Sequence, residues 1–273
     1  MDVLGEPKID GHCHVLDPAR FPYAAEARYH PTGQEMGNAA YFRHLMACYE
    51  VRHALLVGPN SGYATDNRCL LDALRSAPGV FKGIAVVPLD CSADRLAELK
   101  ALGIIGVAFN PSLMGSAYYA GIEPLLARLE QLGLWAQFQV EGDLLTDFLP
   151  MLERVAVKVM IDHCGRPHLP DGIQQPGFQH LLALGRERRA VVKVSGFAKF
   201  SQTGFPFDDI RPWIDSLVRH FGLEQCVWAS DWPYLKAPYR LDYGPMLRIY
   251  EQMFSATERH QLMWLSPKHH FGF

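Results

Sequence analysis

The chain has 273 residues, 49% of them hydrophobic and 11% aromatic, which is enough apolar material for the core of one sizeable domain. A formal net charge of -3, with no cluster of Lys and Arg, argues against nucleic acid as a partner. No apolar run approaches the roughly 20 residues that cross a bilayer, so we expect no membrane partner. The first residues lack a secretory signal, and six scattered cysteines without a C-x-x-C pair indicate reduced thiols, so we expect a cytoplasmic protein.

Short apolar runs recur along the chain. Each run is continuously hydrophobic, as in parallel strands that are covered on both faces. The predicted strands are 8–14, 53–57, 81–87, 104–109, 134–140, 157–162, 190–195 and 225–230. Periodic segments between them predict helices, several behind an Asn, Ser or Asp that can cap a helix. These helices are 39–50, 67–76, 93–102, 121–131, 143–154, 177–186, 208–221 and 242–254, followed by a helical turn at 257–265 and a tail at 266–273.

Eight strands, each followed by a helix, predict an α/β fold, namely a (β/α)8 TIM barrel in a single domain over residues 1–273. The longest irregular segments, 15–37, 110–120, 163–175 and 199–207, all follow a strand. Such segments meet at the C-terminal ends of the strands, where barrel enzymes carry their active sites. We therefore expect the active site at that end of the barrel.

Two histidines close the first predicted strand. His12 and His14 are two residues apart, so their side chains leave an extended strand on the same side. A neutral imidazole can bind a metal, and a protonated one can donate a hydrogen bond to an oxyanion. This pair, at the predicted barrel mouth, is therefore a candidate for catalysis.

Two further strand ends carry candidate groups. His163 follows the sixth strand, and Arg166, in the turn that follows, would project a planar fork suited to an anion. Asp231 follows the eighth strand, among aromatic residues, and can act as a general base toward water or as a metal ligand. Three imidazoles and one carboxylate would thus converge on one cavity only if the sheet closes on itself.

These motifs together resemble the amidohydrolase superfamily, in the branch of the 2-pyrone-4,6-dicarboxylate hydrolases and sugar-acid lactonases. The resemblance runs along nearly the whole chain. Its strings are DGHCHV at 10–15, FPY at 21–23, TDN at 65–67, GIAVV at 83–87, FN at 109–110, IDHCGRP at 161–167, VKVSG at 192–196 and WASDWP at 228–233.

The resemblance implies hydrolysis of a small lactone. Asp231 would deprotonate the attacking water, while His12, His14 and His163 would polarise the ester carbonyl and hold the oxyanion. It also implies contacts to the substrate from other residues of the barrel mouth. The substrate-binding residues expected in this way are Tyr29, Asn60, Asn110, Gln139, Arg166 and Lys199.

The chain departs from the pyrone hydrolases at the positions that bind carboxylates. In the family that the chain resembles, arginines after strands four and seven bind the carboxylates of the substrate. This chain has no cation after strand four and Lys199 after strand seven, and Lys is not an equivalent fork. We therefore expect a lactone with fewer negative charges, of carboxylated or sugar-acid type.

Metal ligands are the second departure. In members of the superfamily with two metal ions, the ligands include a carboxylated Lys or a Glu at strand four and a His on strand five. This chain has Asn110 and Gln139 in those regions. His12, His14 and Asp231 could still hold a single Zn²⁺ with an open position. The resemblance to the pyrone hydrolases implies hydrolysis without a metal ion. We therefore expect no cofactor, with one Zn²⁺ as the alternative.

Other readings remain open. The same site could serve a lactone isomerase, in which an internal hydroxyl attacks, or a Zn-dependent decarboxylase of the same superfamily. A barrel kept only for binding would not need four polar groups at strand ends. Cys13 and Cys164 each lie beside a motif histidine and are either catalytic thiols or packing residues. The substrate is expected to be a small-molecule lactone, and a homo-oligomer is compatible with the sequence.

Overall fold

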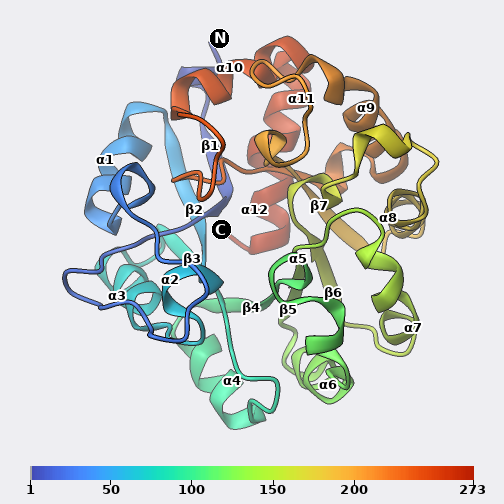
Figure 1. Ribbon diagram of the computed structural model, residues 1–273. Coiled ribbons are helices and arrows are strands. Elements are labelled where there is room, and N and C mark those ends of the chain that lie inside the picture. The colour runs from blue at the N-terminus through green and yellow to red at the C-terminus, as the bar shows by residue number, and fades with distance from the viewer. Residues whose placement is uncertain (1) are drawn as a thin grey trace.

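The computed structural model describes residues 2–273 and shows parallel strands surrounded by helices (Figure 1). One eight-stranded sheet runs in chain order, and every neighbouring pair from the first strand to the last is parallel. This confirms the predicted (β/α)8 TIM barrel. The strands are β1 (Lys8–Cys13), β2 (Val51–Val57), β3 (Phe81–Ala85), β4 (Ile104–Phe109), β5 (Trp135–Phe138), β6 (Lys158–Ile161), β7 (Ala190–Val194) and β8 (Cys226–Trp228).

Helices follow the strands along the chain and surround the barrel (Figure 1). None of those in residues 2–273 is both long and apolar enough to span a membrane. The helices are α1 (Ala39–Cys48), α2 (Asn60–Tyr63), α3 (Arg68–Ser76), α4 (Ala93–Ala101), α5 (Pro111–Met114), α6 (Glu123–Leu132), α7 (Leu149–Leu152), α8 (Pro176–Arg186), α9 (Arg211–Phe221), α10 (Tyr243–Met253), α11 (Ala256–His260) and α12 (Ser266–Phe271).

The predicted helix at 143–154 is confirmed only in part, because residues 144–152 are helical but do not form one continuous α-helix. A 3-10 turn over Leu144–Phe148 precedes the single turn of α7, which has a proline near its first position. Pro150 has no N–H to continue a helix that began upstream, and the side chain of Asp143 accepts a hydrogen bond from Gly177 N at 2.6 Å instead of capping a long helix. The short α5, inside a segment expected to be irregular, and the short α2, between a predicted strand and a predicted helix, were not predicted.

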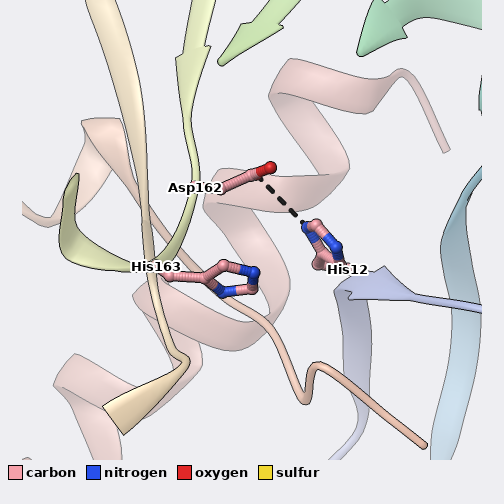
Figure 2. Close-up of side chains that lie close together, drawn as sticks. All are labelled: His12, Asp162 and His163. Atoms are coloured by element: carbon pink, nitrogen blue, oxygen red, sulfur yellow. Dashed lines mark hydrogen bonds and ion pairs between the residues drawn. The ribbon is translucent and has the colours of Figure 1, made fainter. Parts of the chain in front are cut away.

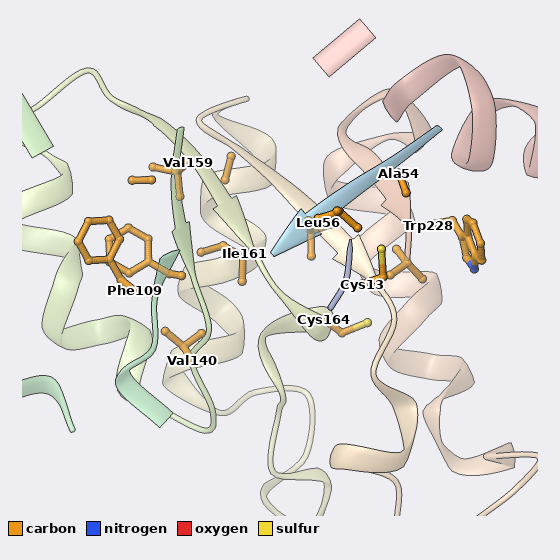
Figure 3. Close-up of a cluster of buried hydrophobic side chains, with 14 of the residues drawn as sticks. Cys13, Ala54, Leu56, Phe109, Val140, Val159, Ile161, Cys164 and Trp228 are labelled. Carbon is orange, nitrogen blue, oxygen red and sulfur yellow. The ribbon is translucent and has the colours of Figure 1, made fainter. Parts of the chain in front are cut away.

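Two apolar layers hold the barrel. The larger lies between strands and helices and includes the residues in Figure 3, among them Leu56, Phe109 and Trp228. The smaller fills the barrel interior below the active-site end, where Phe271 of α12 packs with strand residues. Its other buried members are Ile9, Leu55, Val57, Ile84, Trp135, Met160, Val191 and Val227. The C-terminal α12 therefore packs against the bottom of the barrel interior.

A bulge in β1 brings the histidines inward. Between Asp10 and Cys13 the pairing with β2 slips by one residue, so both Ile9 and His12 face the interior despite their odd spacing. Gly11 is needed here, because a Cβ would lie 2.7 Å from the carbonyl oxygen of Trp228. The β1 bulge thus places His12 where the interior becomes polar.

The seam between β8 and β1 is closed by the segment that carries Asp231. Asp231 N donates to His12 O at 2.9 Å, and His14 N donates to Trp232 O at 2.8 Å. The buried carboxylate of Asp10 accepts from Ser230 N at 2.9 Å in place of a backbone oxygen. The barrel closes through its catalytic candidates, which fixes their relative positions.

Candidate active site

Asp231 is surrounded by the three predicted histidines. Its Oδ1 lies 3.5 Å from Nε2 of His163, 3.8 Å from Nε2 of His14 and 3.9 Å from Nε2 of His12. All four side chains are buried, with at most 8% of the residue exposed. The predicted convergence of three imidazoles and one carboxylate is therefore found in the structure.

Asp231 is held as an anion. Burial acts to raise its pKa, but the neighbouring His163 and Lys199 outweigh burial and hold the pKa well below its usual range. The Nζ atom of Lys199 lies 3.8 Å from Oδ2. The backbone of Asp231 has a φ of 61°, a left-handed conformation that is unfavourable for a residue with a side chain. Strain of this kind is common at functional sites.

His14 is a neutral hydrogen-bond acceptor on its pocket side. Burial, together with His12, lowers the pKa of His14 to about 4, so the ring is neutral near pH 7. Its Nδ1 lies 2.8 Å from the carbonyl oxygen of Val57, which can only accept, so Nδ1 carries the proton. The Nε2 atom is consequently bare and cannot donate to an ester carbonyl.

His163 lies behind Asp231 and does not line the cavity that the described residues form. Its Nδ1 is 3.0 Å from the hydroxyl of Ser195, and its Nε2 faces Asp231. If the Ser195 hydroxyl donates to Nδ1, the Nε2–H is left to donate toward the carboxylate. Figure 2 shows the ring between the end of β6 and His12.

A left-handed turn directs both His163 and Arg166 inward. The four residues from His163 to Arg166 all have φ between 43° and 72°, and Arg166 N donates to His163 O at 2.9 Å. Side chains three apart in a 3-10 turn lie on the same side, so both reach the barrel mouth. Left-handed residues other than glycine cost roughly 1–2 kcal/mol each, which the packing of this loop must offset.

The cavity at the C-terminal ends of the strands has a volume of about 190 Å³, suited to a small molecule. The residues that line it include Asn60, Asn110, Gln139, Arg166 and Lys199. Tyr29 is not among the lining residues in the described part of the chain. Its hydroxyl donates to Glu35, and the Nζ of Lys236 lies 4.7 Å from its ring centre. The structure therefore brings five of the six predicted contact residues together.

Arg166 offers a donor to a ligand. Its Nε is buried and has no hydrogen-bond acceptor within residues 2–273. The amide of Gln139, with its oxygen turned toward the guanidinium, accepts from Nη1 at 3.2 Å and holds it in place. A buried guanidinium with a free N–H is an anion-binding group, since leaving that donor unpaired is costly. Burial lowers the pKa of Arg166, and the charges of Asp231, Asp162 and Glu141 act against that lowering.

A buried ionic network below the cavity was not predicted. Lys193 of β7 lies 3.0 Å from Oδ1 of Asp162 and donates to Oε1 of Gln137 at 2.6 Å. Asp162 in turn lies 3.2 Å from Nδ1 of His12, the contact drawn in Figure 2. The available signal was Lys193 itself, a charged residue between Val192 and Val194 in a strand buried on both faces.

The cysteines beside the histidines have packing roles. Cys13 and Cys164 are fully buried, and their thiols point to backbone oxygens of Leu55 and Ser195. Burial raises the pKa of Cys164 to about 12 and that of Cys13 well above its usual range. Neither thiol is a nucleophile at neutral pH. All six cysteines, which lie within the described residues, are free thiols, as expected.

Comparison with known proteins agrees with this fold. A family model described as Amidohydrolase matches residues 9–273, and the chain belongs to this family. The 4-sulfomuconolactone hydrolase of Hydrogenophaga intermedia is 27% identical over 229 residues, 82% of this chain and 74% of that protein. A probable 2-pyrone-4,6-dicarboxylic acid hydrolase of Acinetobacter baumannii, solved with citric acid bound, has 28% identity and a TM-score of 0.87, covering 98% of this chain and 100% of that chain.

The residues present also fit a metal ion. A Burkholderia multivorans amidohydrolase with bound zinc shares the fold, with 19% identity and a TM-score of 0.75 over 98% of this chain and 100% of that chain. In the present chain, one ligand atom each from His12, His14 and Asp231 lies within 4.8 Å of the others. Two imidazoles and a carboxylate are a suitable donor set for Zn²⁺ with an open position. This cluster could therefore hold one ion.

Proposed function

We propose that the chain is a hydrolase that opens the ester of a small carboxylated or sugar-acid lactone by attack of water. The observation that carries this proposal is the ionised Asp231, enclosed by three imidazoles and facing a cavity that also contains Arg166. Ester hydrolysis needs a base for water and donors for the oxyanion, and both lie within this site. Two relatives, 27% and 28% identical to this chain, are named 4-sulfomuconolactone hydrolase and probable 2-pyrone-4,6-dicarboxylic acid hydrolase, which supports the proposal.

Asp231 acts as the base in the proposed mechanism. The charge of Lys199 and the surrounding imidazoles, which hold the pKa of Asp231 low, also make it a weak base in the free site. A substrate carboxylate bound by Arg166 and Lys199 would offset part of that charge. Substrate binding would then raise the basicity of Asp231 at the moment when it must accept a proton from water.

The three histidines have different roles in this mechanism. His12 lines the cavity and is assigned the contact to the developing oxyanion. His14, bare at Nε2, accepts a hydrogen bond from the attacking water or from a neighbouring donor. His163 orients the carboxylate of Asp231 from behind. One such donor to an oxyanion contributes roughly 3 kcal/mol to the transition state.

His12, His14 and Asp231 would hold a single zinc ion if one binds. Bound there, zinc would supply Lewis-acid polarisation and lower the pKa of a coordinated water to about 7. Arg166 and Lys199 keep their roles toward the substrate carboxylate in either case. We favour the metal-free site for the reaction.

A pH-indicator screen tests the proposed function. Pyrone, muconate-type and sugar-acid lactones are incubated with the full-length protein, once with a chelator and once with added Zn²⁺. Acid release is followed with the pH indicator, and the ring structure of the product is determined by NMR. We expect net acid release from at least one carboxylated lactone in the presence of the chelator. A change of ring without acid release would instead indicate the isomerase, and loss of CO₂ only with zinc would indicate the decarboxylase. No reaction with any lactone in either condition would overturn the proposal.

A further inference from the structure

The Nδ1 atom of His12 lies between a donor and an acceptor. It is 3.2 Å from Nζ of Lys193 and 3.2 Å from Oδ1 of Asp162. A ring nitrogen of a neutral imidazole either carries a proton and donates, or is bare and accepts. The amino group of Lys193 donates, and the carboxylate of Asp162 accepts. Which of these two neighbours His12 bonds to is therefore decided by its tautomer.

The opposite edge of His12 faces His14. The two Nε2 atoms are 3.2 Å apart, within hydrogen-bond distance. The Nε2 of His14 is bare, because its Nδ1 must donate to Val57 O. A hydrogen bond across this gap requires a proton on Nε2 of His12. The alternative tautomer would set two lone pairs against each other at 3.2 Å, which is unfavourable unless a cation lies between them.

The contacts of Lys193 fix its amino group beside Nδ1 of His12, where it favours one tautomer of the His12 ring. Its Nζ is fully buried and also contacts Gln137 and Asp162, so the amino group is fixed in position. When it donates to Nδ1 of His12, every polar atom of the chain Lys193–His12–His14–Val57 has a partner. When Nδ1 of the neutral ring donates to Asp162 instead, no proton lies between the two Nε2 atoms, and a cation bound there would pair them.

We propose that Lys193 is a positioning residue that holds His12 as the Nε2–H tautomer, so that a proton lies between the Nε2 atoms of His12 and His14 at the cavity wall and the pair resists a cation. The Asp162-bonded tautomer is the one that a metal ion on His12, His14 and Asp231 requires, because a ligating nitrogen must be bare. The pair Lys193 and Asp162 thus sets whether this barrel favours the metal-free or the metal-bound state. This inference concerns proton placement and cation affinity, so it stands or fails independently of the lactonase activity.

Nitrogen NMR of the imidazoles tests the proposal in the wild-type chain. Two-bond proton–nitrogen spectra of the full-length, chelator-treated protein distinguish protonated from bare ring nitrogens, and the spectrum of His12→Asn assigns the His12 signals. We expect Nε2 of His12 to be protonated and Nδ1 to be bare. A protonated Nδ1, with or without a proton on Nε2, would overturn the proposal. This measurement needs no altered Lys193 and so does not depend on whether a variant folds.

Two lysine variants separate tautomer control from simple charge removal. Lys193→Met should move the His12 proton to Nδ1 and raise the affinity for Zn²⁺ about 10-fold, the usual size of an effect from a hydrogen-bond partner of a ligating histidine. Lys199→Met removes a cation that lies 3.8 Å from Asp231 and can also raise zinc affinity, but it should leave the His12 nitrogen pattern unchanged. Zinc affinity is measured by competition with a chromophoric chelator. An unchanged tautomer in Lys193→Met, or the same tautomer shift in Lys199→Met, would contradict the inference.

Discussion

The two halves of the barrel mouth differ in chemistry. The charged half, on β1, β6, β7 and β8, consists of His12, His14, His163, Arg166, Lys199 and Asp231. The amide half, on β2, β4 and β5, consists of Asn60, Ser61, Asn110, Ser112 and Gln139, with Glu141 as its acid. Most groups of the charged half are buried and bonded to one another, whereas Asn60, Asn110 and Gln139 are partly exposed.

This difference suggests that the charged half serves catalysis and the amide half serves substrate binding. Groups fixed by the seam, by the left-handed turn and by the network below them are suited to stabilise a transition state, which requires fixed geometry. Neutral amides and hydroxyls at the rim are suited to bind the ground state and choose among substrates. Changes to His12, His14, His163 or Asp231 should therefore reduce kcat, whereas changes in the amide half, and to the substrate-binding Arg166 and Lys199, should mainly raise KM.

Removing the base tests this division most severely. Asp231→Asn should lower kcat about 1,000-fold, the order expected for loss of a general base, while ligand affinity stays near the wild-type value. Steady-state kinetics with a lactone substrate, and calorimetry with its hydrolysis product, measure the two effects. Asp171→Asn, an exposed carboxylate on the loop after β6, is the matched control and should be fully active. Full turnover in Asp231→Asn would remove the assigned base.

The burial of His14 predicts an acid-sensitive fold. Its pKa is about 4 in the folded state, against 6.5 for an unperturbed histidine, mainly because of burial. Between these values the unfolded chain binds more protons, so the free energy of unfolding must decrease as pH falls, by about 3 kcal/mol over the whole window. His14→Gln should flatten this part of the curve, whereas replacing the exposed His44 should not. Urea unfolding at several pH values across the window measures it, and an unchanged slope in His14→Gln would contradict the assignment.

Arg166 connects recognition with the charged half. Arg166→Lys keeps the charge but loses the fork, so KM for carboxylated lactones should rise about 10-fold, as for a lost charge-assisted hydrogen bond. Neutral lactones should show little change. Arg68→Lys, at an exposed ion pair with Asp66, is the control. Equal losses for charged and neutral lactones would show that Arg166 only supports the loop.

The amide half should give the smallest effect. Gln139→Leu removes an amide that lies between Asn110 and Arg166 and should raise KM about 3-fold with kcat nearly unchanged, as for one neutral hydrogen bond. Steady-state kinetics on the same substrate measure both constants. A kcat loss as large as that of Asp231→Asn would show that the two halves do not divide binding from chemistry.

The fold and the catalytic candidates could be predicted because they depend on local patterns. Parallel strands produce continuous apolar runs, and barrel active sites follow strand ends, so His12, His14, His163 and Asp231 could be located. The segment 143–154 forms a 3-10 helix and then one α-helical turn, because Pro150 has no N–H to continue an α-helix from upstream.

Other features depended on the tertiary arrangement. The network around Lys193 requires knowing that the β1 bulge turns His12 toward the interior, and a one-residue slip in pairing cannot be read from hydrophobicity. The position of Tyr29 outside the cavity lining follows from a long loop whose path is set by contacts such as that with Glu35. The bare Nε2 of His14 follows from a single backbone oxygen on the neighbouring strand.

Hydrolysis in water enriched with ¹⁸O tests the central claim most directly. A carboxylated lactone found in the screen is converted by the chelator-treated wild-type protein, and the product is analysed by mass spectrometry. Attack by the water that Asp231 activates places one ¹⁸O atom in the new carboxylate, with none in the hydroxyl that leaves the ring. A product that forms at the same rate without the heavy isotope would mean that an internal hydroxyl, and not water, attacks the ester.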